Sequence, residues 1–369
     1  MIDMSTNTLK QTLSSRPVLF HVHGIGSHDF SSMTSDALPE VNAIAVERNV
    51  DLIPTIFLRR EYVPDLKQIL QDWKEARDRG GLPSILGFGV EGPMLGTSGG
   101  VPPAGCWLPD AKTWRELATL GNIGLRYIVI APDACELDEA LDGDLTFRAL
   151  IELFYQHGVR LALGHFRHDN PSESARRTEA VIDMVEKFTC GQPDMLLTDH
   201  LYNDMPRAFT HAWRTEEERM HRDKELELFL SKPWNTDSLA ELLGPVPATI
   251  IEAARTRRLL PMLNFDGTHV DLEICRRTVD YVGADQLIAI TDHTETDAMA
   301  GENLSLSKSN SLRLRLDGQV AAGSTDISKQ IENMRSISLS DAQIDELVSE
   351  TPRRALTDFT CPPYRSAGR

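Results

Sequence analysis

Histidines and carboxylates stand directly after several short apolar runs of this chain. The first run leads into the HVHG step at residues 21–24, where alternation along a strand would turn the imidazoles of His21 and His23 to one side, able to hold one metal ion. Further runs lead into ligands of the same kind: Glu91, His165, His200 and Asp292. Histidine and carboxylate side chains bind zinc and related divalent metals. The pattern therefore predicts a metal centre made of these six residues.

Eight β-rich apolar runs recur along the chain, with helical patterns between them. They are residues 18–21, 52–58, 85–90, 127–130, 161–164, 195–198, 259–264 and 287–291. Several are almost continuously apolar, as expected for parallel strands covered on both faces, and each interval leaves room for a crossover helix. Eight such units predict an α/β protein built as a closed (β/α)8 barrel of the TIM type, whose strand ends would bring the metal ligands together at one rim.

Helical patterns occupy the intervals between the runs, and the clearest cover residues 64–79, 146–157, 172–187 and 341–350. Ser340 and Asp341 could cap the last of them. The longer, highly charged interval 214–258 is interpreted as a helical insertion packed over the barrel. Since no internal repeat, low-complexity tract or linker is apparent, we expect residues 1–369 to form one domain with its core at about 18–357.

Composition narrows the class of protein. The 369 residues carry a formal net charge of −17, which disfavours binding to nucleic acid or to an anionic membrane. No stretch is apolar for long enough to suggest a membrane span, and the first residues lack the apolar core of a secretory signal. The five cysteines are widely spaced and include no CxxC pair, which favours free thiols. We expect a cytoplasmic protein with a small-molecule substrate.

The order HxH, Glu, His, His, Asp resembles that of the amidohydrolase superfamily, and the local motifs resemble those of the N-acetylglucosamine-6-phosphate deacetylases. The resemblance covers about residues 18–357. The segments similar to that family's motifs are FGVEGP at 88–93, HLYNDMP at 200–206, DGTHVD at 266–271, TD at 291–292 and AGS at 322–324. Together these motifs imply the same barrel and the same metal-dependent chemistry.

The resemblance also implies which ligands bind which metal ion. Glu91, His165 and His200 would hold the metal that every family member keeps, whereas His21 and His23 match positions that bind a second ion in binuclear relatives. Glu91 could then bridge the two ions, and Asp292 would reach a metal or its bound water. One or two divalent ions are expected, with zinc favoured and iron, manganese or cobalt as alternatives.

The implied reaction is removal of the N-acetyl group from an N-acetyl amino sugar, such as N-acetylglucosamine 6-phosphate or a related compound. A bound metal lowers the pKa of its water towards about 7, and the resulting hydroxide would attack the amide carbonyl. Asp292 would act as general base and return the proton to the amine, while His269 would steady the oxyanion. The resemblance assigns substrate contacts to Asn203, Asp204 and Arg207 as well as His269, and implies a homodimer.

Three departures from the family pattern bear on the substrate. The chain has no counterpart of the strands that form an accessory β-sandwich in the family, so a barrel alone is expected. The loop after Glu91 reads LGTSGGVPP at 95–103 where the family has a segment like KGAHNPE. The phosphate-binding REPG segment has no clear counterpart, and Arg207 and Arg214 are the nearest candidates.

Two further differences fall inside the matched motifs. Asp204 replaces a small alanine and adds negative charge near the expected phosphate site, which favours an unphosphorylated or differently decorated amino sugar. His293 replaces an alanine beside the catalytic aspartate, and no role is assigned to it.

Two other functions stay open at this point. An amidohydrolase with another amide substrate, an N-acyl amino acid or a cyclic amide, would keep the same metal site. A non-catalytic binding protein would keep the barrel, although all expected ligands and the catalytic aspartate are present. The remaining histidines are interpreted as surface or packing residues: His28, His157, His168, His211 and His221.

Overall fold

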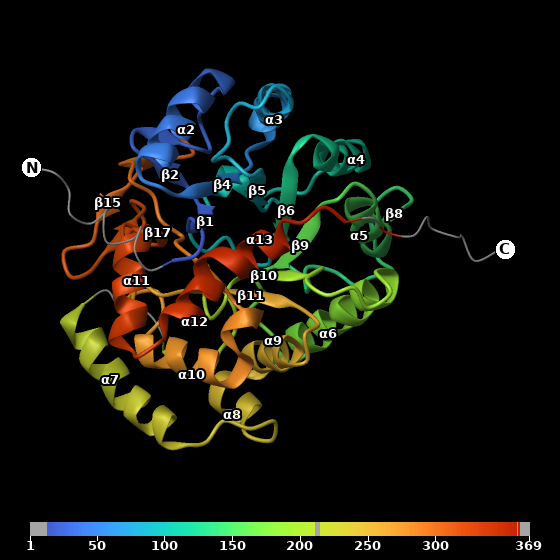
Figure 1. Ribbon diagram of the computed structural model, residues 1–369. Coiled ribbons are helices and arrows are strands. Elements are labelled where there is room, and N and C mark those ends of the chain that lie inside the picture. Colours follow the sequence, from blue (N-terminus) through green and yellow to red (C-terminus); the bar gives the residue numbers. More distant parts are fainter. Residues whose placement is uncertain (1–12, 211–214, 360, 362–369) are drawn as a thin grey trace, which may run out of the picture.

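A computed structural model describes residues 13–210, 215–359 and 361 of the chain. Eight parallel strands close into a barrel in the order β1-β12-β11-β10-β9-β6-β5-β4 (Figure 1). The strands are β1 (Val18–Val22), β4 (Asp51–Phe57), β5 (Phe88–Glu91), β6 (Leu125–Ile130), β9 (Arg160–Leu163), β10 (Leu197–His200), β11 (Leu260–Asn264) and β12 (Ile288–Ile290). Each overlaps one of the eight predicted runs, so the predicted (β/α)8 barrel is confirmed.

The strands are apolar along their whole length because both of their faces are covered. Alternate residues divide between two cores: Phe20 and Ile53 pack inside the barrel, whereas their neighbours Leu19 and Leu52 pack outward against the helices. This division explains why the strands appear in the sequence as continuous rather than alternating apolar runs.

Eight helices follow the strands in turn and form the outer layer. They are α2 (Leu38–Glu47), α3 (Val63–Asp78), α4 (Ala111–Thr119), α5 (Phe147–Gln156), α6 (Pro171–Phe188), α9 (Pro245–Arg255), α10 (Leu272–Val282) and α11 (Ile327–Ser336). Side-chain caps stabilise several of their first turns. The Thr146 side chain accepts from the backbone N–H of Ala149 at the start of α5, and the Asn170 side chain accepts from that of Glu173 at the start of α6. The predicted helices at 64–79, 146–157 and 172–187 correspond to α3, α5 and α6.

The interval predicted as a helical insertion, 214–258, contains three helices, while Arg214 itself lies outside the described residues. α7 (Glu216–Ser231) and α8 (Leu239–Leu243) lie outside the ring of barrel helices (Figure 1). The third, α9, is the barrel helix between β10 and β11. The additional part is therefore shorter than the predicted interval.

Small antiparallel sheets in the loops were not predicted. Two of the four lie between β12 and α11, where β13 (Ala298–Met299) pairs with β14 (Glu302–Asn303) and three further strands form a second sheet. These three are β15 (Ser305–Leu306), β16 (Leu312–Leu314) and β17 (Val320–Gly323). Two other pairs are β2 (Gly24–Ile25) with β3 (His28–Asp29), and β7 (Ala140–Asp142) with β8 (Leu145–Thr146).

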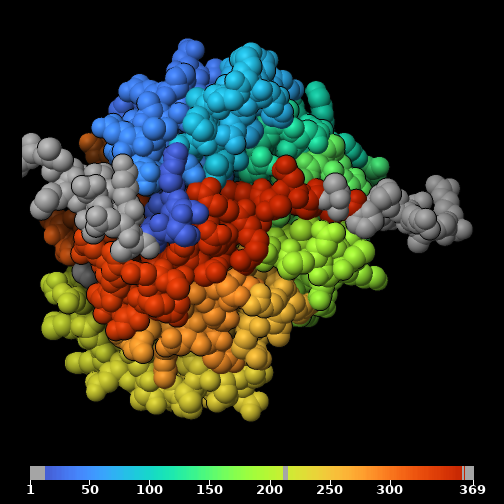
Figure 2. All heavy atoms as spheres, viewed as in Figure 1, coloured from blue at the N-terminus to red at the C-terminus, as the bar shows by residue number. Residues whose placement is uncertain are grey.

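The final segment closes the amino-terminal end of the barrel. α12 (Asp341–Asp345) starts at a capping box of Ser340 and Gln343, as the sequence predicted for Ser340, and runs through a π-turn into α13 (Thr351–Ala355). Figure 1 shows α12 and α13 in front of the strands, and Figure 2 shows the red C-terminal residues covering the centre of this face. The open end of the barrel is therefore the opposite one.

None of the helices in the described part of the chain combines the length and apolarity that a membrane span requires. All five cysteines are described, and each carries a free thiol, as expected.

Candidate metal centre

Four histidines and three carboxylates meet at the carboxyl ends of the barrel strands. Each comes from the last residues of a strand or the residues just after it, and each is at most 6% exposed. They are His21 of β1 and His23 just after it, Glu91 of β5, His165 after β9, Asp199 and His200 of β10, and Asp292 after β12. All six predicted ligands are thus brought together, and Asp199 joins them.

Glu91 lies between two pairs of histidines. Its Oε1 is 2.6 Å from Nε2 of His165 and 3.5 Å from Nε2 of His200. Its Oε2 is 3.1 Å from Nε2 of His21 and 3.4 Å from Nε2 of His23. One carboxylate oxygen faces each pair, an arrangement that could bridge two metal ions.

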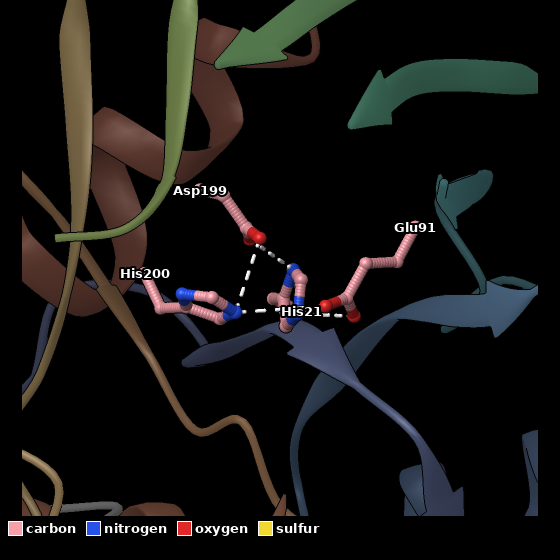
Figure 3. A group of neighbouring side chains, drawn as sticks. All are labelled: His21, Glu91, Asp199 and His200. Atoms are coloured by element: carbon pink, nitrogen blue, oxygen red, sulfur yellow. Dashed lines mark ion pairs between the residues drawn. The ribbon is translucent and has the colours of Figure 1, made fainter. Parts of the chain in front are cut away.

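Asp199 and Asp292 flank this arrangement on either side. Asp199 places Oδ1 3.2 Å from Nδ1 of His21 and Oδ2 3.1 Å from Nε2 of His200, and Figure 3 shows these side chains converging with Glu91. Asp292 places Oδ1 3.3 Å from Nε2 of His23. Among the described residues, three overlapping groups have metal-type ligand atoms close together: His21 with Glu91, Asp199 and His200; His21 with His23 and Asp292; and His200 with His165 and Asp204.

Irregular backbone at the strand ends aims these side chains inward. β1 gains a residue relative to β4 between Leu19 and Val22, and β10 does so relative to β11 between Leu197 and His200. Such bulges re-aim side chains that strict alternation would send to opposite faces. His21 has a left-handed φ of 55°, and the corresponding residues after β9 and β12 behave alike, with φ of 53° at His165 and 42° at Asp292. Such strain in residues other than glycine concentrates at functional sites.

The donors and acceptors of the cluster fit a bound cation. Nδ1 of His23 lies 3.3 Å from the Thr55 carbonyl, and Nδ1 of His165 lies 3.2 Å from the Thr97 carbonyl, so each Nδ1–H donates outward. The other ring nitrogen of each, Nε2, faces the carboxylate of Glu91, at 3.4 Å for His23 and at the hydrogen-bonding distance of 2.6 Å for His165. A divalent ion would be held by these Nε2 atoms and the carboxylate, and it would displace the proton shared by His165 and Glu91.

Buried atoms without a hydrogen-bond partner mark the same place. Within the described residues they include Nε2 of His21 and of His23, Oε2 of Glu91, and both carboxylate oxygens of Asp199. Buried polar atoms are nearly always satisfied in folded proteins. Their concentration in one cluster, together with the chemistry of the donor set, indicates a site for one or two divalent metals.

A chain of hydrogen bonds sets the orientation of His21. The Thr55 hydroxyl lies 3.4 Å from the Ile53 carbonyl and 2.6 Å from the Tyr127 hydroxyl, which lies 3.3 Å from Nδ1 of His21. If Thr55 donates to the carbonyl, Tyr127 donates to Thr55 and accepts from Nδ1–H, which leaves the Nε2 lone pair of His21 facing the cluster. Gly89 makes room for Tyr127, since a Cβ there would lie 2.3 Å from the tyrosine ring.

Burial and opposite charges shift the pKa values of the cluster in opposite directions. Burial opposes a charge on His200, but the carboxylates of Asp199 and Glu91 outweigh it and raise its pKa to about 10. Burial likewise opposes ionisation of Asp292, but His23 and His269 outweigh it and lower its pKa to about 2. In the metal-free protein, protons on the histidines therefore balance the carboxylates, and a metal would replace those protons.

His269, predicted to act on the substrate, lies beside Asp292. Its Nδ1 is 2.6 Å from Oδ2 of Asp266, and its Nε2 is 3.6 Å from Oδ2 of Asp292. Asp266 was not predicted as a site residue. The glycine of the AGS turn, Gly323, donates its backbone N–H to the Asp292 carbonyl at 2.7 Å, and a Cβ there would lie 3.1 Å from the His269 ring.

A cavity of about 400 Å³ opens onto the cluster, and the predicted substrate residues Asn203, Asp204 and Arg207 line it. The loop at Gly99, the residue Glu218 of α7 and the strand β17 complete the wall. His168, expected to be a surface or packing residue, is exposed and also lines the cavity. His293 lies apart from the ligand cluster, with its Nε2 3.9 Å from Oε1 of Glu295.

Comparison with protein-family models and with curated proteins gave no match. Among solved structures, the chain resembles the N-acetylglucosamine-6-phosphate deacetylase of Pasteurella multocida, with a TM-score of 0.65 and 16% identity over 93% of this chain and 76% of that one. The Mycobacterium smegmatis enzyme of that name gives 0.63 and 21% over 93% and 78%, and that of Thermotoga maritima 0.59 and 14% over 94% and 82%. The resemblance predicted from the motifs is therefore present in the fold.

Proposed function

We propose that this protein is a metal-dependent amidohydrolase that removes the N-acetyl group from an N-acetyl amino sugar, releasing acetate and a free amine. The observation that carries the proposal is the position of Glu91 between two pairs of histidines, with Asp292 beside them at the floor of a cavity. The likeness in fold to deacetylases of N-acetylglucosamine 6-phosphate supports this choice of substrate class.

The chain offers ligands for two ions. His21 and His23 would hold one, His165 and His200 the other, and Glu91 has one oxygen toward each pair. A divalent ion there supplies a water of lowered pKa and polarises the amide carbonyl. Zinc suits this set of imidazoles and carboxylates, and iron, manganese or cobalt could replace it.

Asp292 is the group placed to carry the proton. Its depressed pKa keeps it ionised at neutral pH, and its Oδ1 lies among the histidine ligands while its Oδ2 faces His269. A carboxylate in this position can take a proton from the attacking water and deliver it to the departing amine.

His269 is placed to donate to the oxyanion of the reacting carbonyl. Although burial opposes its charge, Asp266 and Asp292 raise its pKa. Since Nδ1–H donates to Asp266, a protonated His269 presents Nε2–H beside Asp292 in the cavity. A fixed donor at the place where negative charge develops stabilises the transition state.

Acetate release by the zinc-loaded protein tests the proposal. The substrates are N-acetylglucosamine, its methyl glycoside and N-acetylglucosamine 6-phosphate, with Asp292→Asn and chelated protein as blanks. Asp144→Asn, which changes a 92% exposed carboxylate, serves as the matched control. We expect the protein and the control to release acetate from at least one sugar. The two blanks should release none. If zinc-, iron-, manganese- and cobalt-loaded protein all fail on every sugar, the proposal is wrong.

A further inference from the structure

The positions at which the sequence departs from the deacetylase motifs meet in one wall of the cavity. They are the loop at 95–103, Asp204, and Arg207 as the nearest candidate for a missing arginine, and residues of all three line the cavity. Separate loops supply them, after β5 and after β10. Their meeting in space was not visible in the sequence.

Asp204 and Gly99 fit against each other. A Cβ on Gly99 would lie 2.1 Å from Oδ2 of Asp204, and Gly99 has a left-handed φ of 51°, which favours glycine. Asp204 itself has a left-handed φ of 41°. The glycine in the changed loop therefore packs directly against the aspartate in the changed motif.

The other side of the same loop packs against β17. A Cβ on Gly100 would lie 2.4 Å from the Val320 carbonyl oxygen and 2.9 Å from Cα of Ala321. The loop is thus confined between Asp204 and the strand. The Asp204 side chain packs against this loop and remains 30% exposed where it lines the cavity.

Within residues 13–210, 215–359 and 361, which do not include the candidate Arg214, no ion pair joins Asp204 to an arginine. Among the ion pairs of the described residues its only partner is Nδ1 of His165 at 3.9 Å, and that nitrogen also lies 3.2 Å from the Thr97 carbonyl, the nearer acceptor for its proton. Nη1 of Arg207 lies 3.4 Å from the Met205 carbonyl, and burial lowers the Arg207 pKa, a lowering that the nearby charge of Asp204 partly offsets. The wall therefore presents a carboxylate to the substrate.

We propose that the substrate is an N-acetyl amino sugar that carries no phosphate, and that Asp204 accepts a hydrogen bond from one of its hydroxyl groups. This inference rests on the proposed function and deepens it. A carboxylate accepts a hydroxyl proton, whereas it repels a phosphate dianion, so one residue both binds the neutral sugar and rejects the phosphorylated one. Asp204 is then a specificity-determining residue.

The first measurement is kcat/KM of the zinc-loaded protein for N-acetylglucosamine, its methyl glycoside and N-acetylglucosamine 6-phosphate. We expect an unphosphorylated sugar to be preferred by at least about tenfold at low ionic strength, with the preference shrinking as salt screens the repulsion. Asp204→Asn should lower this preference by about tenfold, because it keeps the shape but removes the charge. Asp144→Asn should leave it unchanged.

Binding measured without turnover separates the preference for a sugar from its hydrolysis. Calorimetry of zinc-loaded Asp292→Asn with the same sugars should show tighter binding of the unphosphorylated ones. If the phosphorylated sugar is hydrolysed or bound preferentially, or if Asp204→Asn leaves the preference unchanged, this inference is overturned while the proposed function stands. If no sugar is hydrolysed by the protein or bound by the variant, the proposed function fails and the inference fails with it.

Discussion

The two ends of the barrel differ in how their charged side chains are paired. At the amino-terminal end, Arg353 of α13 donates to Asp51 at 2.6 Å, and Arg354 donates to Asp194 at 2.5 Å. At the carboxyl-terminal end, carboxylates such as Asp199 and histidines crowd together with several of their atoms unpartnered. One end pairs its charges within the chain, while the other leaves them available for a ligand.

The closed end therefore contributes to stability and the open end to function. Ion pairs at the closed end join α13 to Asp51 of β4 and to Asp194 just before β10, so they tie the final helix to distant parts of the barrel. The unpartnered polar atoms concentrated at the open end destabilise the folded chain, and they persist where function requires them. Substitutions at the two ends should therefore have separable effects.

The largest effect should come from Asp292→Asn at the open end. Loss of a proton-transferring carboxylate lowers turnover by about 100-fold or more, while asparagine preserves the size of the side chain. The measurement is acetate release, with the unfolding midpoint of the zinc-loaded protein recorded alongside. Asp51→Asn, the matched change at the closed end, should keep turnover within about twofold. Equal losses of turnover in the two variants would remove the functional contrast between the ends.

Arg353→Ala at the closed end should lower stability rather than turnover. The change leaves Asp51, which is 6% exposed, with Arg16 as its remaining cation, and should lower the free energy of unfolding by about 1–3 kcal/mol. Urea denaturation measures the loss. The control is Arg79→Ala at a 73% exposed arginine, where a loss below about 1 kcal/mol is expected. A smaller loss for Arg353→Ala than for the control would contradict the stabilising role of this end.

Metal affinity should rise with pH. The raised pKa of His200, about 10 in the metal-free protein, means that its proton is bound at neutral pH and must leave when a metal takes its place. Each proton released should strengthen binding by about tenfold per pH unit between pH 6 and 8. Competition with a chromophoric chelator measures this slope, and His157→Gln, remote from the cluster, should leave it unchanged. A flat profile would mean that the histidines bind no protons in the metal-free protein.

The smallest effect should come from Tyr127→Phe, which removes a hydroxyl that contacts His21 and leaves the fold intact. Loss of such an outer hydrogen bond should weaken zinc binding by about tenfold, measured by chelator competition. The matched control is Tyr155→Phe, which removes another buried hydroxyl, one that donates to the Met195 carbonyl at 2.8 Å. That variant should lose stability without losing zinc affinity, and a similar loss of affinity in both would exclude a specific role for Tyr127.

The barrel could be predicted from the sequence because strands covered on both faces must be apolar along their length. The ligands could be predicted because strands such as β5 end directly in them, at Glu91. Asp199 was missed for a physical reason: strict alternation puts it on the opposite face from His200, and only the bulge in β10 brings both inward. Asp266 was missed because its role depends on His269, three residues away, turning back toward it.

The roles of single residues came from the resemblance rather than from periodicity or composition. The short strands between β12 and α11 carry little apolar pattern, since residues such as Ser305 and Leu306 in β15 are exposed. Their pairing depends on the rim they rest against, so the sequence alone gave no sign of them.

The strand β17 belongs to a sheet held within a single loop, and this arrangement makes the molecule modular. The metal ligands sit on barrel strands or directly beside them, whereas the segments 95–103 and 305–323 touch the substrate side of the cavity as replaceable inserts. Exchanging only the parts that line the cavity, 99–100 and 319–321, should change the substrate preference, whereas Thr97 and Gly323 must stay because they contact His165 and Asp292. The confinement of Gly100 against Val320 implies that exchanging one segment alone would produce a misfit between them.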